Sequence, residues 1–294
     1  MEAEMMLYKL KSELARNRYF GRIRNSAMEM PRGWKRTVFV WGGVMDVLWH
    51  HGLRLYDYQK EIEQIKDNGC MFSFTSYGKK IHMYLPGYQT DYLQQQIARY
   101  AQFWEIAVLD ELRKHVIRPG DVILDIGANI GNHTVYFGRI CAASSIHAFE
   151  PVKDTFSILA RNVKCNGLDE KACLHQTALG SSNGKAAIKY FNETEIGSAQ
   201  LQASNDGDME IRRLDDYAFE RIDFIKIDVE KFEVELLKGA KETLTRLSPA
   251  IFIEIFEENF NEADRLLNEY GYYIDREFSL CNYLYRKRDG CREL

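Results

Sequence analysis

The chain has 294 residues, 46% of them hydrophobic and 28% charged, and its formal net charge is −4 at pH 7. This composition is typical of a globular protein and excludes a disordered or fibrous chain, and the slight negative charge gives no general affinity for nucleic acid. The length accommodates one large α/β domain with an extension.

Residues 1–70 are predicted to form a small accessory region. Residues 1–36 carry nine basic and four acidic side chains, and apolar residues at helical spacing predict a short amphipathic helix there. A strand, a Gly42-Gly43 turn and a helix to about Lys66 follow. We expect this region to dock on the main domain or on another subunit in a homo-oligomer. Attraction to an anionic acceptor or a membrane surface is the alternative.

The protein is expected to lie in the cytoplasm. Its start lacks the basic segment and apolar core of a secretory signal. The apolar stretch from Val38 to Trp49 is too short to span a membrane. The six cysteines show no C-x-x-C spacing, so we expect reduced thiols and no metal site.

Residues 71–294 are predicted to form the main domain, beginning with a β-hairpin over 71–75 and 80–85. A long helical region from about Thr90 to Val116 comes next. The apolar run Val122–Ile126 then reads as a strand buried on both faces, and it ends at Gly127.

The turn after this strand resembles a nucleotide-type site. Gly127 and Gly131 allow close approach of the backbone to a ligand, and the first turn of the following helix offers free N–H groups. Asp125 lies at the strand end, where a buried carboxylate needs a partner or a ligand. A plain structural turn is the alternative.

The second strand, Ile146–Glu150, places an acid about 20 residues beyond this loop, where it can accept both hydroxyls of an adenosine ribose. The loop lacks the G-x-G-x-x-G spacing that fits a pyrophosphate, and no arginine follows Glu150. S-adenosylmethionine, which carries a sulfonium and no phosphate, therefore fits better than a nicotinamide dinucleotide.

The rest of the chain alternates strands and helices, which predicts a doubly wound sheet. We expect a helix over 153–165, a strand over 173–179, a polar insertion over 181–206 with a short strand at 188–191, a strand over 223–230, a helix over 233–247, a strand over 250–255, a helix over 261–270 and a terminal antiparallel pair at 272–275 and 282–285. The insertion is either an acceptor-binding loop or disordered surface.

The strand over 223–230 has an unusual polar face. Its two-residue repeat sets Lys226, Asp228 and Glu230 on one side. Such a row is costly in a central strand unless it is paired or used. Since this strand is expected beside the first, Asp228 or Glu230 can orient an acceptor hydroxyl or remove its proton, and Lys226 can hold Asp228 ionised. An exposed strand end or a structural Lys–Asp pair is the alternative.

Three stretches carry a resemblance to the FkbM family of S-adenosylmethionine-dependent methyltransferases: Leu124–Gly131, Phe149–Pro151, and Ile225–Glu230 with Glu233 and Leu237–Ala240. The resemblance implies an α/β, Rossmann-like class I fold of about seven strands with a terminal antiparallel hairpin. It also implies O-methylation of a hydroxyl on a sugar, glycan or secondary metabolite. The family usually has glycine after the last acid, where this chain has Lys231.

The loop and the resemblance together indicate the following cofactor-binding residues: Asp125, Gly127, Ala128, Asn129, Gly131, Asn132, Glu150, Pro151 and Ala178. Lys226, Asp228 and Glu230 are the candidate catalytic residues, with Asp228 preferred as the base. Tyr100, Glu105 and Glu254 are further candidates to line the site. Three alternatives stay open: a metal-assisted O-methyltransferase with Asp228 as a ligand, a nicotinamide-dependent oxidoreductase, and a non-catalytic binding module.

Overall fold

A computed structural model of the protein describes residues 63–192, 194–278 and 281–288. The helix, strand and turn predicted for residues 1–62 lie outside them. No helix in the described part of the chain combines the length and apolarity that crossing a membrane requires.

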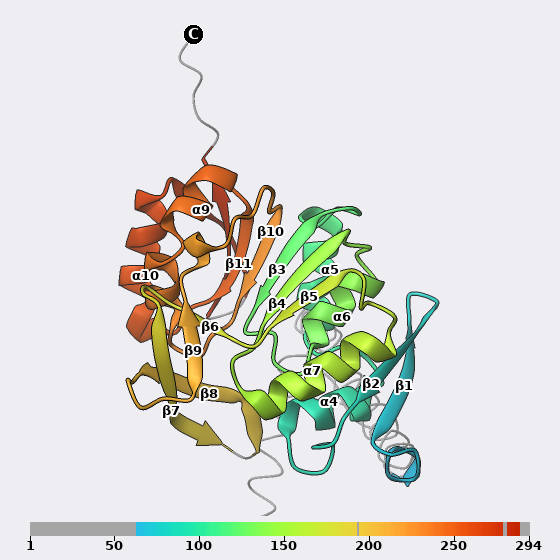
Figure 1. Ribbon diagram of the computed structural model, residues 1–294. Coiled ribbons are helices and arrows are strands. Elements are labelled where there is room, and N and C mark those ends of the chain that lie inside the picture. The colour runs from blue at the N-terminus through green and yellow to red at the C-terminus, as the bar shows by residue number, and fades with distance from the viewer. Residues whose placement is uncertain (1–62, 193, 279–280, 289–294) are drawn as a thin grey trace, which may run out of the picture. The chain divides into compact units, whose positions relative to one another are not determined.

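The main sheet has seven strands in the order β12-β13-β11-β10-β3-β4-β5 (Figure 1). Their bounds are β3 (Val122–Ile126), β4 (Ser145–Phe149), β5 (Ala172–His175), β10 (Phe224–Ile227), β11 (Ala250–Glu254), β12 (Tyr272–Glu277) and β13 (Asn282–Lys287). The five strands from β11 to β5 pair in parallel, and β13 pairs antiparallel with both β11 and β12. The order reverses between β3 and β10, which is where ligands bind in such sheets. The predicted fold class is confirmed.

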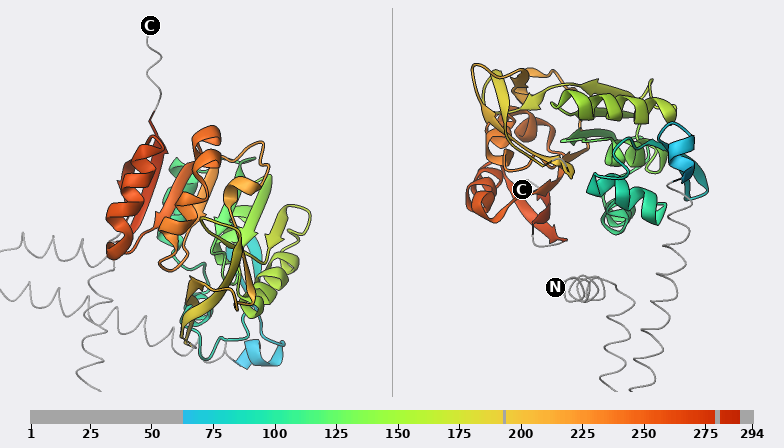
Figure 2. Two further views of the ribbon diagram at one scale, coloured as in Figure 1. Left: turned by 60° about the vertical axis from the view of Figure 1, so that its left-hand side comes forward. Right: turned by 90° about the horizontal axis from the view of Figure 1, so that it is seen from below.

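Helices cover both faces of this sheet, as the two views of Figure 2 show. Their bounds are α4 (Tyr92–Tyr100), α5 (Ile106–His115), α6 (Asn132–Arg139), α7 (Lys153–Cys165), α8 (Glu233–Lys238), α9 (Lys241–Leu247) and α10 (Glu257–Glu269). Alternate side chains of β3, β10 and β11 pack with α8, α9 and α10 in one apolar core. On the opposite face Phe224 of β10 contacts Phe137 of α6, with ring centroids 5.8 Å apart.

The single helix predicted from about Thr90 to Val116 is wrong, because α4 and α5 are separate. Ala101 ends α4 in the left-handed conformation (φ 48°), and Glu105 precedes α5 in the same conformation (φ 56°). Phe103 between them is buried against Tyr136 of α6, with ring centroids 5.2 Å apart. The chain therefore leaves the helical path to bury an aromatic ring, and this turn carries Glu105 into the site described below.

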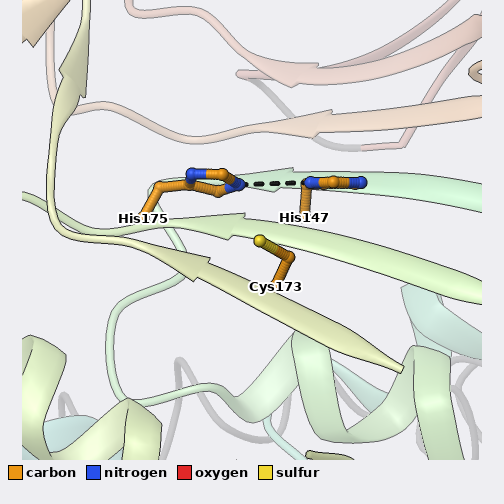
Figure 3. Close-up of side chains that lie close together, drawn as sticks. All are labelled: His147, Cys173 and His175. Carbon is orange, nitrogen blue, oxygen red and sulfur yellow. Dashed lines mark hydrogen bonds between the residues drawn. The ribbon is translucent and has the colours of Figure 1, made fainter. Parts of the chain in front are cut away.

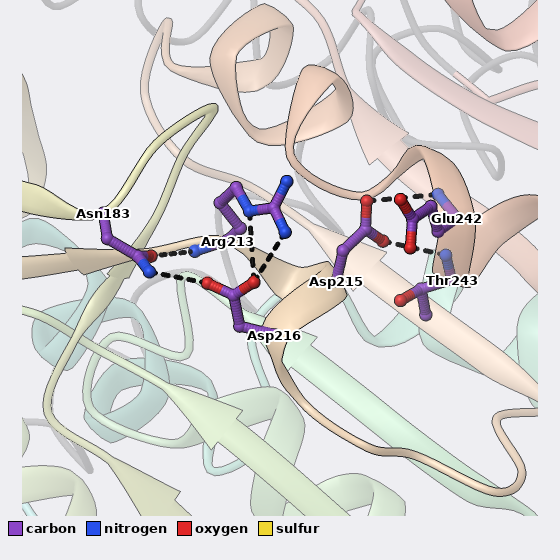
Figure 4. A network of polar contacts seen from close by, with 6 residues as sticks. All are labelled: Asn183, Arg213, Asp215, Asp216, Glu242 and Thr243. Atoms are coloured by element: carbon purple, nitrogen blue, oxygen red, sulfur yellow. Dashed lines mark hydrogen bonds and ion pairs between the residues drawn. The ribbon is translucent and has the colours of Figure 1, made fainter.

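The helix predicted over 233–247 is also divided, into α8 and α9. The side chain of Asp215, in the 3-10 turn η1 (Leu214–Asp216), accepts hydrogen bonds from the backbone N–H groups of Glu242 (3.1 Å) and Thr243 (2.8 Å), as Figure 4 shows. These N–H groups belong to the first turn of α9, so Asp215 caps a helix from a distant segment. Beside it, Asp216 accepts from Arg213 and Asn183, which fixes the start of η1.

Residues 178–212 form a second sheet, and it includes the polar insertion over 181–206 that was predicted to be an acceptor-binding loop or disordered surface. Its strands are β6 (Ala178–Leu179), β7 (Gly184–Asn192), β8 (Glu195–Ala203) and β9 (Met209–Arg212), in the order β6-β9-β7-β8. The strand predicted over 173–179 is therefore split between β5 and β6. Residues 181–206 are mainly the β7–β8 hairpin, of which the predicted strand at 188–191 is a part.

One strand and one helix differ from their predicted bounds in other ways. β10 ends at Ile227, so Asp228 and Glu230 lie beyond it, and α10 begins at Glu257 rather than Asn261. The predicted hairpin near the start of the main domain is present as β1 (Met71–Ser76) and β2 (Lys79–Tyr84), which pair antiparallel.

Candidate active site

A buried ion pair lies at the centre of the site. The parallel register of β3 and β10 places Asp125 beside Lys226, and their side chains are 0% and 3% exposed. Lys226 Nζ is 3.5 Å from Asp125 Oδ1 and donates a hydrogen bond of 2.6 Å to the carbonyl of Gly127. Thr134 of α6 donates to the other oxygen of Asp125 at 2.5 Å. This pair joins the two strands where the sheet order reverses.

Lys226 also contacts a second carboxylate, since its Nζ lies 3.5 Å from Asp228 Oδ2. Burial disfavours the charge on Lys226, but the carboxylates of Asp228 and Asp125 raise its pKa above the usual value. One buried cation thus holds two acids in place, of which Asp228 is 35% exposed.

The turn after β3 fits tightly against the segment that follows β10. Gly127 has φ +74°, and a Cβ there would lie 1.7 Å from the carbonyl oxygen of Asp228. This close approach to the backbone of Asp228 by itself requires glycine at position 127, whether or not a ligand also contacts the turn. Gly131, the N-cap residue of α6, has φ +88°.

Glu150 follows β4 and holds the same turn from the other side. Its Oε2 accepts from the N–H of Asn129 at 3.0 Å, and its Oε1 accepts from Val152 at 2.9 Å. Burial raises the pKa of Glu150 to about 7, against the effect of these hydrogen bonds. Each carboxylate oxygen has a second acceptor position, so Glu150 can still accept from a ligand.

A small, mainly apolar cavity of about 60 Å³ lies beside Glu150. It is lined by Ile126, Gly127, Asn129, Phe149, Glu150, Pro151, Val152, Thr177, Ala178, Leu179, Ile196, Gly197, Ala199, Leu201, Asp228, Val229, Glu230 and Phe232. Asn129 Oδ1 is buried and has no hydrogen-bond partner among the described residues. Glu150 and the unpaired Asn129 acceptor match the polar groups of an adenosyl ligand, but the cavity is smaller than that ligand, so its walls would have to move apart to admit it.

A larger cavity of about 360 Å³ adjoins the first and has more charged residues in its lining. It is lined by Asp91, Tyr92, Leu93, Trp104, Glu105, Gly127, Ala128, Asn129, Asn132, His133, Gly197, Ser198, Lys226, Asp228, Glu230, Phe252, Glu254 and Asn282. The two cavities share Gly127, Asn129, Gly197, Asp228 and Glu230. Asp228 therefore stands at their junction.

The titratable groups of the larger cavity are strongly perturbed. Burial and the charge of Asp228 raise the pKa of Glu105 to about 7. Burial, the charge of Asp228 and a hydrogen bond with it raise the pKa of Glu254 to about 9. Burial and the nearby Lys226 lower the pKa of His133 to about 4. At neutral pH Glu254 is thus a hydrogen-bond donor and His133 is uncharged, as is typical of functional sites.

Most residues predicted from the sequence meet around these two cavities, but several have other positions. Asp125 and Gly131 line neither cavity, and neither does Tyr100. Asn132 lines the larger one, and its side chain is hydrogen-bonded to the backbone of Trp104 in both directions. Asn132 therefore holds the α4–α5 turn over the site.

The residues that close the larger cavity are not among those predicted from the sequence. Asp91 caps α4 through Gln94 N–H and also accepts from Ile196 N–H at 3.0 Å, which ties β8 to the site. His133 and Trp104 also line this cavity. Only His133, directly after the glycine-containing loop, could have been suspected from its position.

A family profile described as "Methyltransferase FkbM domain" matches residues 125–274. This range begins at Asp125, near the end of β3, and includes β4, β10 and β11. The chain belongs to the FkbM methyltransferase family. Membership agrees with the resemblance noted in the sequence, and it favours a methyltransferase over the nicotinamide oxidoreductase alternative.

Several relatives of this FkbM-family chain are named as methyltransferases. The chain is 28% identical over 193 residues to "Methyltransferase sdnD" of Sordaria araneosa, covering 53% of this chain and 74% of that one. It is 29% identical over 168 residues to "2-O-methyltransferase NoeI" of Sinorhizobium fredii, covering 50% and 68%. It is 28% identical over 144 residues to "Hexuronic acid methyltransferase AglP" of Haloferax volcanii, covering 46% and 56%.

The departure from the family pattern at Lys231 has a clear structural setting. Glu230 and Lys231 form a turn with φ values of 49° and 76°, a conformation that favours glycine. Lys231 tolerates it with several contacts: its N–H donates to Glu233 at 2.7 Å, and its Nζ is 3.0 Å from Glu258. The prediction that Glu230 continues the strand face of Lys226 is wrong, because β10 ends at Ile227 and the chain turns.

Proposed function

We propose that this protein transfers the methyl group of S-adenosylmethionine to a hydroxyl oxygen of a sugar or a related metabolite. The observation that carries the proposal is the junction of the two cavities at Asp228, with an adenosyl-type cavity on one side and a polar cavity on the other. The relatives named for 2-O-methylation and for a hexuronic acid support a hydroxyl-bearing acceptor.

The small cavity marks the proposed position of the adenosyl group, which needs more room than its 60 Å³. Glu150 would accept from the ribose hydroxyls, Ala178 and Pro151 would contact the adenine, and Asn129 Oδ1 would accept from a polar N–H or O–H of the ligand. Ala128 and Gly127 lie where the amino-acid portion would pass toward the larger cavity. When bound, S-adenosylmethionine supplies an electrophilic methyl carbon on its sulfonium.

The larger cavity suits an acceptor with several hydroxyl groups. Trp104 and Tyr92 lie edge to face, with ring centroids 5.6 Å apart, and provide apolar surface for a sugar ring. Glu105, Glu254 and Ser198 add donors and acceptors around that surface. Aromatic rings can pack against the apolar C–H groups of a sugar, and carboxyl groups can form hydrogen bonds with its hydroxyl groups.

Asp228 is the proposed base. The acceptor O–H donates to its carboxylate, the oxygen attacks the methyl carbon, and the proton passes to Asp228 as the carbon–oxygen bond forms and the carbon–sulfur bond breaks. Lys226 and protonated Glu254, which is hydrogen-bonded to Asp228, position this carboxylate. Proximity supplies most of the acceleration, and the base adds about 10²–10⁴-fold.

A cation-assisted reaction is the second mechanism to test. In the described part of the chain, the acids of the larger cavity do not bring three ligand atoms within 4.8 Å of one another. This geometry favours proton transfer to Asp228 over binding of a divalent cation. Turnover that survives a chelator agrees with this, whereas loss of turnover that Mg²⁺ or Mn²⁺ restores would contradict it.

The test of the proposal is Asp228→Asn, with Asp169→Asn as the matched control because Asp169 is an exposed acid remote from both cavities. Methyl transfer from labelled S-adenosylmethionine is measured over a panel of glycans and hydroxylated metabolites. Asp228→Asn should lower turnover about 10²–10⁴-fold while S-adenosylhomocysteine binds as before. Unchanged turnover would remove Asp228 from the mechanism.

We further propose that residues 71–294 form the catalytic domain and that residues 1–70 provide a contact for homo-oligomers. The basic, amphipathic N-terminal sequence supports this role. The slight negative net charge supports the proposal that the protein has no nucleic-acid partner, and the lack of C-x-x-C spacing supports reduced thiols and a cytoplasmic enzyme. Mass measurement of the full chain in solution tests the oligomer: a monomer at micromolar concentration would contradict it.

A further inference from the structure

Three side chains with metal-binding atoms lie together on the sheet, away from the candidate active site (Figure 3). His147 is on β4, and Cys173 and His175 are on the edge strand β5. The register pairs His147 with Cys173, and His175 is two residues further along β5. All three side chains therefore project from the same face of the sheet.

The distances within this cluster approach those of a tetrahedral metal site. His147 Nδ1 and His175 Nε2 are 3.1 Å apart. Two nitrogens bound to one tetrahedral zinc ion at about 2.0–2.1 Å lie about 3.3 Å apart. All three ligand atoms lie within 4.8 Å of one another, and a sulfur and a nitrogen on the same ion would be about 3.5 Å apart. Rotation of the exposed Cys173 side chain can supply the remaining movement.

The surroundings hold the two imidazole rings in place. The ring of Phe149 stacks on His175 with centroids 4.4 Å apart and planes at 12°, and Phe219 meets His147 edge to face at 4.8 Å. To bind one ion, both rings would have to turn out of their mutual hydrogen bond so that the two nitrogens face a common point, and these neighbours limit how far they turn. Neighbouring positive charge is paired, since Arg212 Nε is 2.7 Å from Glu210.

An open groove of about 470 Å³ gives access to the cluster. It is lined by Val122, Ser145, His147, His175, Tyr217, Ala218, Phe219, Glu220 and Arg221. An ion held by the cluster would therefore have a free side facing solvent, where water can complete its coordination.

We propose that His147, Cys173 and His175 bind one zinc-like divalent cation, with water in the fourth position. Two imidazoles and a thiolate are the donor set that zinc prefers, and they bind magnesium and calcium poorly. The ion would join β5 to β4 directly behind Phe149 and Glu150. Its role is to brace the strand ends that form the small cavity, and it takes no part in methyl transfer.

The sequence alone gave no sign of this site. Cys173 and His175 are separated by one residue, and His147 lies on a different strand. The pairing of β4 with β5 brings the three together, which is why the cysteine spacing predicted only reduced thiols and no metal.

The test is a titration of the full, untagged, metal-free protein with Co²⁺, which reports a bound thiolate through its charge-transfer absorption. We expect one equivalent of Co²⁺ with this absorption, displaced by Zn²⁺. Cys173→Ser should abolish the absorption. His147→Gln should weaken binding at least about 100-fold, since loss of outer contacts alone costs 10–100-fold.

Cys165→Ser and His82→Gln are the matched controls, because both residues lie outside the cluster. They should bind Co²⁺ as the parent protein does. The proposal is overturned if the parent protein binds no Co²⁺, which would leave the two histidines as a hydrogen-bonded pair only. It is also overturned if Co²⁺ binding survives both Cys173→Ser and His147→Gln. Since Cys173 is exposed, its serine variant should also keep the melting temperature of the metal-free parent.

Discussion

Replacement of Lys226 by methionine tests whether the buried ion pair holds the site together. The change keeps a flexible, unbranched side chain one atom shorter and removes the charge that faces Asp125 and Asp228 at 3.5 Å. Asp125 is completely buried and would lose its counter-ion. Removal of one partner from a buried pair costs about 3–5 kcal/mol, because a charge is left without compensation.

The surface pair of Lys238 is the matched control. Its Nζ is 3.1 Å from Glu235 and 3.0 Å from Glu262, so these contacts are shorter than those of Lys226, but the side chain is 39% exposed. Exposed pairs contribute roughly 0–1 kcal/mol each. Lys238→Met should therefore change the free energy of unfolding by no more than about 1 kcal/mol.

Urea denaturation of both variants measures the difference directly. Lys226→Met should also lower the melting temperature by roughly 6–20 °C, and adding Asp125→Asn should restore much of the loss because the buried charge is then gone. A Lys226→Met variant as stable as Lys238→Met would refute the central place of this pair.

Two further predictions concern the acid cluster and the Lys231 turn. The pKa of Glu254 is raised from 4.5 to about 9, so its contribution to stability is fully present below about pH 4.5 and is lost as pH rises toward 9. Glu254→Gln removes that loss, and in urea denaturation its stability relative to the parent should increase between pH 6 and pH 9; a constant difference would contradict the burial of this carboxyl. Lys231→Gly relieves a left-handed residue worth roughly 1–2 kcal/mol, but adds the flexibility of glycine, roughly 0.5–1 kcal/mol. It also loses the contact with Glu258, so stability should change by less than about 1 kcal/mol. Methyl transfer should persist in this variant, and its loss would show that Lys231 itself is needed for turnover.

The sequence predicted the parallel sheet because its strands are short apolar runs, and such runs can be recognised without knowledge of their neighbours. It also predicted that Asp125, Glu150 and Asp228 would meet, since the carboxyl ends of adjacent parallel strands share one edge. These inferences depend on local pattern and on a general rule of topology.

The helix breaks could not be predicted because their causes are distant in sequence. Asp215 caps α9 from a separate segment. Ala101 takes a left-handed conformation, and because it is not glycine the sequence gives no signal for it. The same applies to the β7–β8 hairpin, whose polar sequence resembles a loop. Its approach to the site depends on Asp91, which lies 105 positions away from its partner Ile196.

The most direct test of S-adenosylmethionine binding at this site is a thermal melt with S-adenosylhomocysteine, S-adenosylmethionine and NAD in separate samples. The same melts are repeated with the Glu150→Gln variant. Ligand at about 100 times its dissociation constant stabilises the folded protein by roughly 2.7 kcal/mol, which corresponds to a rise of roughly 5 °C or more. The account predicts this rise with the two sulfur ligands, a much smaller one in Glu150→Gln, and none with NAD. No rise with either sulfur ligand in the folded parent protein would contradict it.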